Sequence, residues 1–88
     1  MIEVGKSYYF IVHAYHHYIG TVEKELGVQR VSLKNCIKIY SCDRDWESFF
    51  RDGCRKDDTR YDFVGNKPDV RFFDCFEWNH PIPGAKND

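Results

Sequence analysis

The strongest constraint on the fold is the segment 7–13, SYYFIVH, which is aromatic or β-branched along most of its length. Such residues favour an extended strand. Successive side chains of a strand point to opposite faces, so Tyr8 and Phe10 share one face and Tyr9 lies on the other. An antiparallel strand with one solvated face would alternate apolar with polar residues. We therefore expect this strand to be covered on both faces, and a neighbouring subunit is one candidate for the second cover.

Further strand-like segments follow along the chain. They cover residues 18–25, 28–32, 36–40 and 70–78. A short hairpin turn is expected at Leu26-Gly27. Gly20 lies inside the second strand, where a glycine marks a sharp bend or a close approach of backbones. Small barrels need such corners.

A change to helical spacing predicts one short helix at about 44–52. Asp43 is the expected N-cap and Gly53 the terminating residue. One helical face carries the aromatic residues Trp46, Phe49 and Phe50. Residues at this spacing lie side by side on a helix. A helix this short needs tertiary packing, so we expect this face, and Trp46 in particular, to be buried.

These patterns predict a mainly β domain with four or five antiparallel strands in a small bent sheet or barrel, and one short inserted α-helix. A chain of 88 residues is long enough for one domain, which we place at residues 1–83. The polar stretch at about 54–69 contains turn signals and is expected to be a loop. Residues 84–88 are expected to form a flexible tail.

Charge and hydropathy narrow the class of protein. The chain has 13 basic and 14 acidic residues, and this balance disfavours a protein that grips duplex DNA through many phosphates. No apolar run approaches the roughly 20 residues that span a bilayer. The first residues lack the layout of a secretion signal. We therefore expect a cytoplasmic protein without a membrane partner.

The sequence offers little for catalysis or metal binding. Four cysteines, at 36, 42, 54 and 75, form no C-x-x-C pair, so we expect reduced thiols and no bound zinc. Cys54 precedes Arg55-Lys56 but has no histidine nearby in sequence. No glycine-rich phosphate loop is present. We expect no catalytic residue and no cofactor, and hence a protein that is not an enzyme.

Binding residues are easier to find. Aromatic and imidazole rings next to cations are how small barrels hold bases and single strands. The candidate ligand-binding residues are Tyr15, His16, His17, Arg30, Lys34, Asn35, Arg71, Trp78 and His80. They suggest a nucleotide or a short single-stranded nucleic acid as the ligand. Two alternatives stay open: a module that inhibits a host protein through its aromatic surface, or polar strand ends without a ligand.

Two resemblances add to this reading. The stretch 9–35, with Gly20 in a bent strand, Gly27 at a turn and then Val31-Ser32-Leu33, resembles the core of Sm-like proteins, which include the Sm, LSm and Hfq proteins. This match covers about a third of the chain, and the Asp and Asn that Sm proteins carry near Gly27 and Arg30 are missing. A general SH3-like barrel would look similar. The resemblance implies a small barrel whose strand edges close a ring of subunits.

The second resemblance covers most of the chain. The segments HHYIGTV, VSLKNCIKIY, WESFFRDG and EWNHPIP, in that order, resemble a group of short phage and prophage proteins of unassigned activity. The resemblance implies a phage origin, a place in the host cell cytoplasm and a role against host defence. Arg55-Lys56, Cys42 and Cys54 lie outside the shared pattern.

The number of large apolar side chains predicts self-association. One small core is not expected to hide the first strand together with Trp46, Phe72, Phe73 and Phe76. Soluble monomers rarely expose apolar patches above a few hundred Å². We therefore expect a homo-oligomer, a dimer or a larger ring. Its ligand site would lie at a subunit boundary, where Tyr15, His17, Arg30 and Arg71 could meet.

Overall fold

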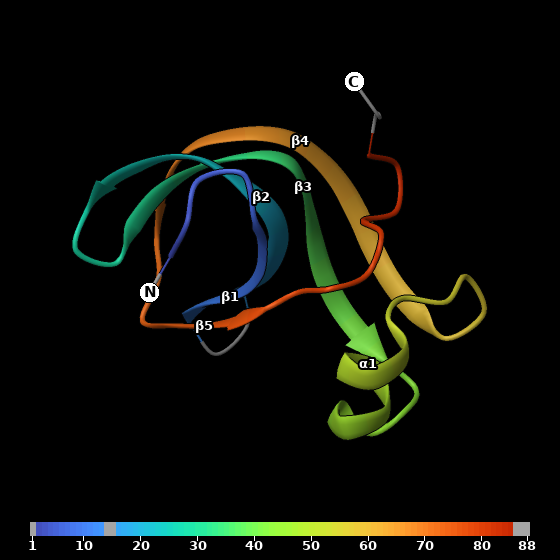
Figure 1. The fold of residues 1–88 in the computed structure, drawn as a ribbon. Coiled ribbons are helices and arrows are strands. Elements are labelled where there is room, and N and C mark those ends of the chain that lie inside the picture. Colours follow the sequence, from blue (N-terminus) through green and yellow to red (C-terminus); the bar gives the residue numbers. More distant parts are fainter. Residues whose placement is uncertain (1, 14–15, 86–88) are drawn as a thin grey trace.

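The protein folds as one five-stranded antiparallel sheet with a short helix (Figure 1). The structure is a computed structural model and describes residues 2–13 and 16–85. The elements are β1 (Ser7–His13), β2 (His16–Gly27), β3 (Arg30–Cys42), α1 (Trp46–Asp52), β4 (Thr59–Arg71) and β5 (Asp74–Glu77). The strand order is β4-β3-β2-β1-β5, and the sheet curls strongly without pairing its two edges. The predicted mainly β fold is confirmed in its bent-sheet form.

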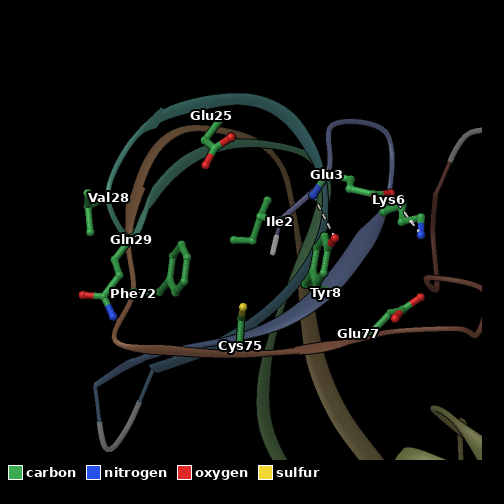
Figure 2. Close-up of a pocket in the computed structure, with 10 residues that line it drawn as sticks. All are labelled: Ile2, Glu3, Lys6, Tyr8, Glu25, Val28, Gln29, Phe72, Cys75 and Glu77. Carbon is green, nitrogen blue, oxygen red and sulfur yellow. Dashed lines mark hydrogen bonds and ion pairs between the residues drawn. The ribbon is translucent and has the colours of Figure 1, made fainter.

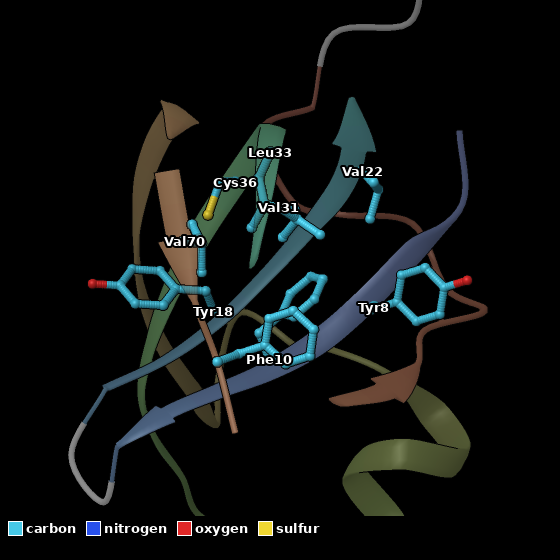
Figure 3. Packing of buried hydrophobic residues seen from close by; sticks show 9 residues of the cluster. Tyr8, Phe10, Tyr18, Val22, Val31, Leu33, Cys36 and Val70 are labelled. Carbon is cyan, nitrogen blue, oxygen red and sulfur yellow. The ribbon is translucent and has the colours of Figure 1, made fainter. Parts of the chain in front are cut away.

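The inside of the curl holds the first of two core clusters, which we call the inner cluster (Figure 3). Its buried members are Tyr8, Phe10, Tyr18, Val22, Val31, Leu33, Cys36, Val70 and Phe72. They come from the first four strands and from the segment that follows β4. The sheet therefore wraps around its own apolar core, as a barrel would.

The second cluster lies on the other face of the sheet, and we call it the outer cluster. It contains Tyr9, Ile19, Ile37, Ile39, Phe49, Trp78 and Ile82. Helix α1 supplies Phe49, and the C-terminal segment supplies Trp78 and Ile82. Both faces of β1 are thus covered, as predicted, but the second cover comes from the same chain and needs no neighbouring subunit.

A bulge in β3 joins two segments that the sequence analysis treats as separate strands. Ile19 and Thr21 of β2 pair with Ile37 and Lys34 of β3, so β3 contains one extra residue there. Asn35 lies in the bulge with φ of 52°. A Cβ atom at Gly20 would lie 3.2 Å from Leu33 Cδ1 and 3.4 Å from Cys36 Cβ. Gly20 therefore marks the predicted close approach, and the bulge bends the sheet opposite it.

The hairpin between β2 and β3 lies two residues later than predicted. The turn residues are Val28 and Gln29, and Gln29 has φ of 54°. Leu26 and Gly27 still belong to β2. Of the two turn residues only Gln29 has a positive φ, so the turn differs from the I′ and II′ types that two-residue hairpins favour. The nearest glycine, Gly27, is the last residue of β2.

Helix α1 is shorter than predicted and buries a different residue. It begins at Trp46, and the N-cap is Asp45, whose carboxylate accepts a hydrogen bond of 2.8 Å from the Ser48 amide. Gly53 ends the helix as predicted, with φ of 84°. Phe49 is fully buried, whereas Trp46 is 50% exposed. The expected burial of Trp46 is wrong because this residue opens the helix at the rim of the outer cluster.

The predicted loop at 54–69 is wrong from residue 59 onward. Residues 59–71 form the edge strand β4, which pairs with β3 from Cys42–Thr59 to Arg30–Arg71. An edge strand tolerates glycine, proline and charged residues, which at Gly65, Lys67 and Pro68 imitate a loop.

The expected last strand at 70–78 is interrupted. Phe72 and Phe73 carry the chain from the β4 edge to the β5 edge. At the C-terminus Ala85 packs against the outer cluster, and its amide donates to the Ile82 carbonyl. Residues 86–88 of the expected tail lie outside the described residues.

Candidate functional site: a basic pocket at one end of the curled sheet

A cavity of about 360 Å³ lies beside the inner cluster, and we call it the basic pocket. Its lining residues are Val12, His13, His16, Tyr18, Lys67, Asp69, Val70 and Arg71. These come from β1, β2 and β4, which places residues that lie some 50 positions apart around one space. The buried Tyr18 contributes an aromatic surface to this end of the inner cluster (Figure 3).

The polar side chains of the basic pocket are mostly cationic or able to become so. His13 and His16 pair across the β1–β2 hairpin, with ring centroids 4.0 Å apart. Lys67 Nζ lies 4.9 Å from the centroid of the Tyr18 ring, a cation–π distance. The carboxylate Asp69 accepts two hydrogen bonds of 2.8 Å from Arg30. The hydrogen bonds from Arg30 lower the pKa of Asp69, and the charges of Arg30 and Arg71 lower it further, so Asp69 compensates Arg30 mainly and Arg71 in part.

The environment of His16 reflects this positive field. Burial lowers its pKa, and the nearby His13, Lys38 and Lys67 lower it further. Desolvation and like charge both disfavour an imidazolium. His16 is therefore mainly neutral at pH 7, but an anion in the pocket would favour its protonation. Fixed cations, an imidazole pair and an aromatic surface together suit an oxyanion carried on a planar group.

The structure brings together only some of the residues chosen from the sequence. His16 and Arg71 line the basic pocket, and Arg30 reaches its edge through Asp69. Arg30 and Arg71 also pair across β3 and β4 and line a smaller cavity of about 240 Å³. Lys34 and Asn35 lie at the β3 bulge and are not lining residues of the basic pocket. Tyr15 lies outside the described residues.

Trp78 and His80 have structural roles. Trp78 is 4% exposed in the outer cluster, so the expectation that it offers a stacking surface is wrong. The His80 ring nitrogen Nε2 lies 2.8 Å from the Phe50 carbonyl oxygen, and the ring packs against Trp78 at 5.1 Å. A Cβ atom at Gly53 would lie 3.0 Å from His80 Cγ. The C-terminal segment therefore holds α1 against the sheet through these two side chains.

His17 belongs to a different surface, because neighbouring residues of a strand point to opposite faces. It lines an aromatic groove of about 240 Å³ together with Tyr9, Ile11, Trp46, Phe50 and Phe76. Tyr9 Oη lies 2.5 Å from His17 Nδ1. Burial raises the pKa of Tyr9, with smaller contributions from Cys54 and Cys42, so the phenol stays protonated. The groove is an apolar surface with one internal polar pair.

Lys67 is the main residue of the basic pocket that the sequence analysis misses. It lies in the stretch interpreted as a loop, so no pattern placed it beside His16. Had β4 been recognised as an edge strand, the antiparallel pairing would have placed its C-terminal half near the start of β3. The distance to the β1–β2 hairpin depends on the curl of the sheet, which local sequence does not encode.

Other kinds of site are not apparent in the described part of the chain. Within residues 2–13 and 16–85, no group of three or more His, Cys, Asp or Glu side chains is placed to hold a metal ion. No helix among these residues has the length and apolar character needed to cross a membrane. Comparison with known proteins finds no family model, curated protein or solved structure that matches this chain.

Proposed function

We propose that this protein binds a nucleotide or a short single-stranded nucleic acid at the basic pocket, without catalysing a reaction. The observation that carries the proposal is the convergence of His13, His16, Lys67 and Arg71 beside the ring of Tyr18. A volume of about 360 Å³ is in the range of small-ligand sites. The resemblance to phage proteins suggests a biological role in which the ligand is sequestered from host defence.

The chemistry of each side chain fits a phosphate-bearing ligand. Arg71 offers a guanidinium that can hold two phosphate oxygens at once, and Lys67 offers a point charge. The imidazole rings of His13 and His16 offer surfaces on which a base can stack. The pocket thus supplies both of the contacts that small barrels use for single-stranded nucleic acids.

The state of the thiols supports a binding role over nucleophilic catalysis. Burial raises the pKa of Cys36 to about 12 and that of Cys54 to about 11. A reactive cysteine needs a lowered pKa so that the thiolate is present at neutral pH. These two thiols remain protonated and unreactive.

The proposal is tested by titrating isotope-labelled protein with adenosine 5′-monophosphate, a hexathymidine oligonucleotide or adenosine while amide resonances are recorded. We expect shifts at residues 12–18 and 67–71 with the two phosphate-bearing ligands and weaker binding of adenosine. Lys67→Ala and Arg71→Ala should each weaken binding about tenfold, as expected for one lost charge-assisted contact. Lys34→Ala removes the same charge from the β3 bulge and should have little effect. Equal effects of Lys34→Ala and Lys67→Ala, or no saturable shifts, would overturn the proposal.

A second candidate function is the inhibition of a host protein through the aromatic groove. The observation that favours it is the exposure of Trp46 at 50% and Phe76 at 45% beside a nearly apolar surface. Tryptophan is enriched among the residues that dominate protein interfaces. A purified host protein that binds the parent and Lys67→Ala but not Trp46→Ser, and whose binding resists nuclease, would favour this function.

A further inference from the structure

A second cavity, larger than the basic pocket, lies at the other end of the inner cluster. Figure 3 shows Tyr8 and Tyr18 on opposite sides of that cluster, and Tyr8 lines this second space. Its volume is about 670 Å³. It opens between the N-terminal residues and the β2–β3 hairpin (Figure 2). We call it the acidic mouth.

The floor of the acidic mouth is apolar. Tyr8 and Phe72 belong to the inner cluster, and the partly buried Ile2 and Cys75 pack against it. Figure 2 shows these four side chains gathered around one space inside the ring of strands. The Tyr8 hydroxyl accepts a hydrogen bond of 2.9 Å from the Glu3 amide, which fixes the N-terminal residues at the rim. The floor offers a preformed surface for an apolar or aromatic group.

The rim of the mouth carries an excess of negative charge. Among the described lining residues are the carboxylates Glu3, Glu25 and Glu77 and the amine of Lys6. Lys6 Nζ lies 3.0 Å from Glu3. That contact raises the pKa of Lys6, and the charge of Glu77 adds to the shift. Glu25 makes no ion pair among the residues that the structure describes. The described side chains that line the mouth, three carboxylates and one amine, therefore carry a net formal charge of −2.

From the floor and the rim together, we infer that the acidic mouth binds an organic cation with an apolar body, such as an aromatic amidine, an amine or an arginine side chain of a peptide. The apolar part would replace water over Tyr8 and Phe72, and the cation would lie among the carboxylates. A concave surface lined by one sign of charge concentrates counter-ions of the opposite sign. An anionic ligand is repelled from this end. The inference concerns a site separate from the basic pocket and does not depend on nucleotide binding.

The charge of the ligand is tested with three probes that share one aromatic ring: benzamidine, neutral benzamide and anionic benzoate. Amide resonances report where each probe binds. We expect benzamidine to shift residues near Ile2, Val28 and Cys75 and to bind about tenfold more tightly than benzamide, a difference typical of charge-assisted contacts. Benzoate should leave these resonances unchanged. Equal affinity for benzamidine and benzamide would overturn the inference.

Variants of the rim residues test which carboxylates cause the preference for a cationic ligand. In Glu25→Gln/Glu77→Gln the preference for benzamidine over benzamide should fall to within about threefold, because two carboxylates are neutralised without a change of shape. Glu23→Gln, an exposed residue of β2 outside the lining, is the matched control and should keep the full preference. A double variant that still prefers benzamidine tenfold would refute the assignment. A preserved resonance pattern shows that the variant folds.

A further titration with an arginine peptide distinguishes a cation from a partner protein from a cationic small molecule. Acetyl-Gly-Arg-Gly-amide binding more tightly than benzamidine assigns the mouth to an arginine of a partner protein, and the reverse order assigns it to a small molecule. Both orders support the class of ligand. If neither cation binds, the inference fails. Adenosine 5′-monophosphate binding to the same double variant should be unchanged, so the two proposals can fail separately.

Discussion

Phe49 is the residue through which α1 enters the core. Its ring is fully buried and lies 5.9 Å from Tyr9 and 5.2 Å from Trp78, measured between ring centroids. Phe49→Ala should lower the free energy of unfolding by about 3–5 kcal/mol, because it leaves a cavity in the outer cluster. Trp46→Ala should cost much less, since half of that side chain is already in water. Urea denaturation of both variants measures the difference, and a larger loss for Trp46→Ala would contradict the packing described.

His16 makes anion binding depend on pH. Its lowered pKa means that the folded protein prefers the neutral imidazole, so without an anion stability is lost as pH falls below about 6.5, the usual histidine pKa. A bound anion reverses the preference, because it stabilises the imidazolium. Sulfate stays a dianion from pH 8 to 5.5. A change in its affinity over this range therefore reports protonation of histidines in the protein and not of the ligand. We expect sulfate to bind more tightly as pH falls, with uptake of protons.

The variant His16→Gln tests this assignment. It should flatten the pH dependence of sulfate binding measured by calorimetry, while Lys67 and Arg71 keep part of the affinity. Glutamine retains a polar side chain at the strand position but does not titrate. His80→Gln is less suitable as a control because His80 contacts the Phe50 carbonyl. An unchanged pH profile in His16→Gln would show that another group takes up the proton.

At the scale of elements, the most buried ion pair of the segment between β3 and β4 joins Arg44 to Asp58. Arg44 Nε lies 2.6 Å from Asp58 Oδ2, and only 12% and 14% of the two side chains are exposed. The Arg44 guanidinium also donates to the carbonyls of Ser48 and Gly53, near the end of α1. The pair therefore fastens the helix to the start of β4.

Breaking the Arg44–Asp58 ion pair should make local unfolding of α1 easier while leaving the sheet largely intact. Burial alone would raise the pKa of Asp58, but hydrogen bonds from Thr59 and Arg44 and the charge of Arg44 outweigh it and lower the pKa. A lowered carboxyl pKa stabilises the fold above the unfolded value near 4, and this contribution is lost as pH falls through the folded pKa. Asp58→Asn should speed amide exchange in residues 46–53 and lower the melting temperature at pH 7. Equal amide exchange rates in α1 of Asp58→Asn and of the parent protein would show that the ion pair does not hold α1 in place.

At the scale of the whole molecule, self-association stays a prediction. The prediction rested in part on a second face of β1 that a neighbouring subunit would cover, but the same chain covers both faces of this strand. Exposed aromatic residues remain, with Trp46 50%, Phe73 57% and Phe76 45% exposed, and Trp46 and Phe76 line the same groove. Short β5 offers an open edge beside Phe76. The apolar surface and the strand edge together favour contact between copies of the chain.

We expect sedimentation at micromolar concentration to show a homo-oligomer, with a dimer as the smallest form. Phe73→Ser/Phe76→Ser should shift the population toward the 10.5 kDa monomer. Val28→Ser is the control, because Val28 is 94% exposed at the tip of the β2–β3 hairpin and does not line the aromatic groove. A single monomeric species of the parent protein would end both this prediction and the idea of a site shared between subunits.

The sequence by itself determined the features that depend on local periodicity. The aromatic run of β1 predicted a strand buried on both faces, and the spacing of Phe49 with Gly53 predicted a short helix and its end. Burial on one or two faces leaves a period in the sequence, and caps and turns leave particular residues at particular places. The fold class, and the positions of β1, β2 and α1 to within two residues, could therefore be predicted without the structure.

Only the tertiary structure decided which side chains meet. β4 pairs with β3 through charged and turn-like residues, so its strand character comes from its partner. Lys67 approaches Tyr18 and His16 because the sheet curls, and the curl depends on the bulge at Asn35 and the close approach at Gly20. Trp46 and Phe49 belong to the same helical face, yet the position of α1 over the outer cluster exposes one and buries the other. Long-range pairing and sheet curvature are properties of the assembled chain, and local sequence patterns do not record them.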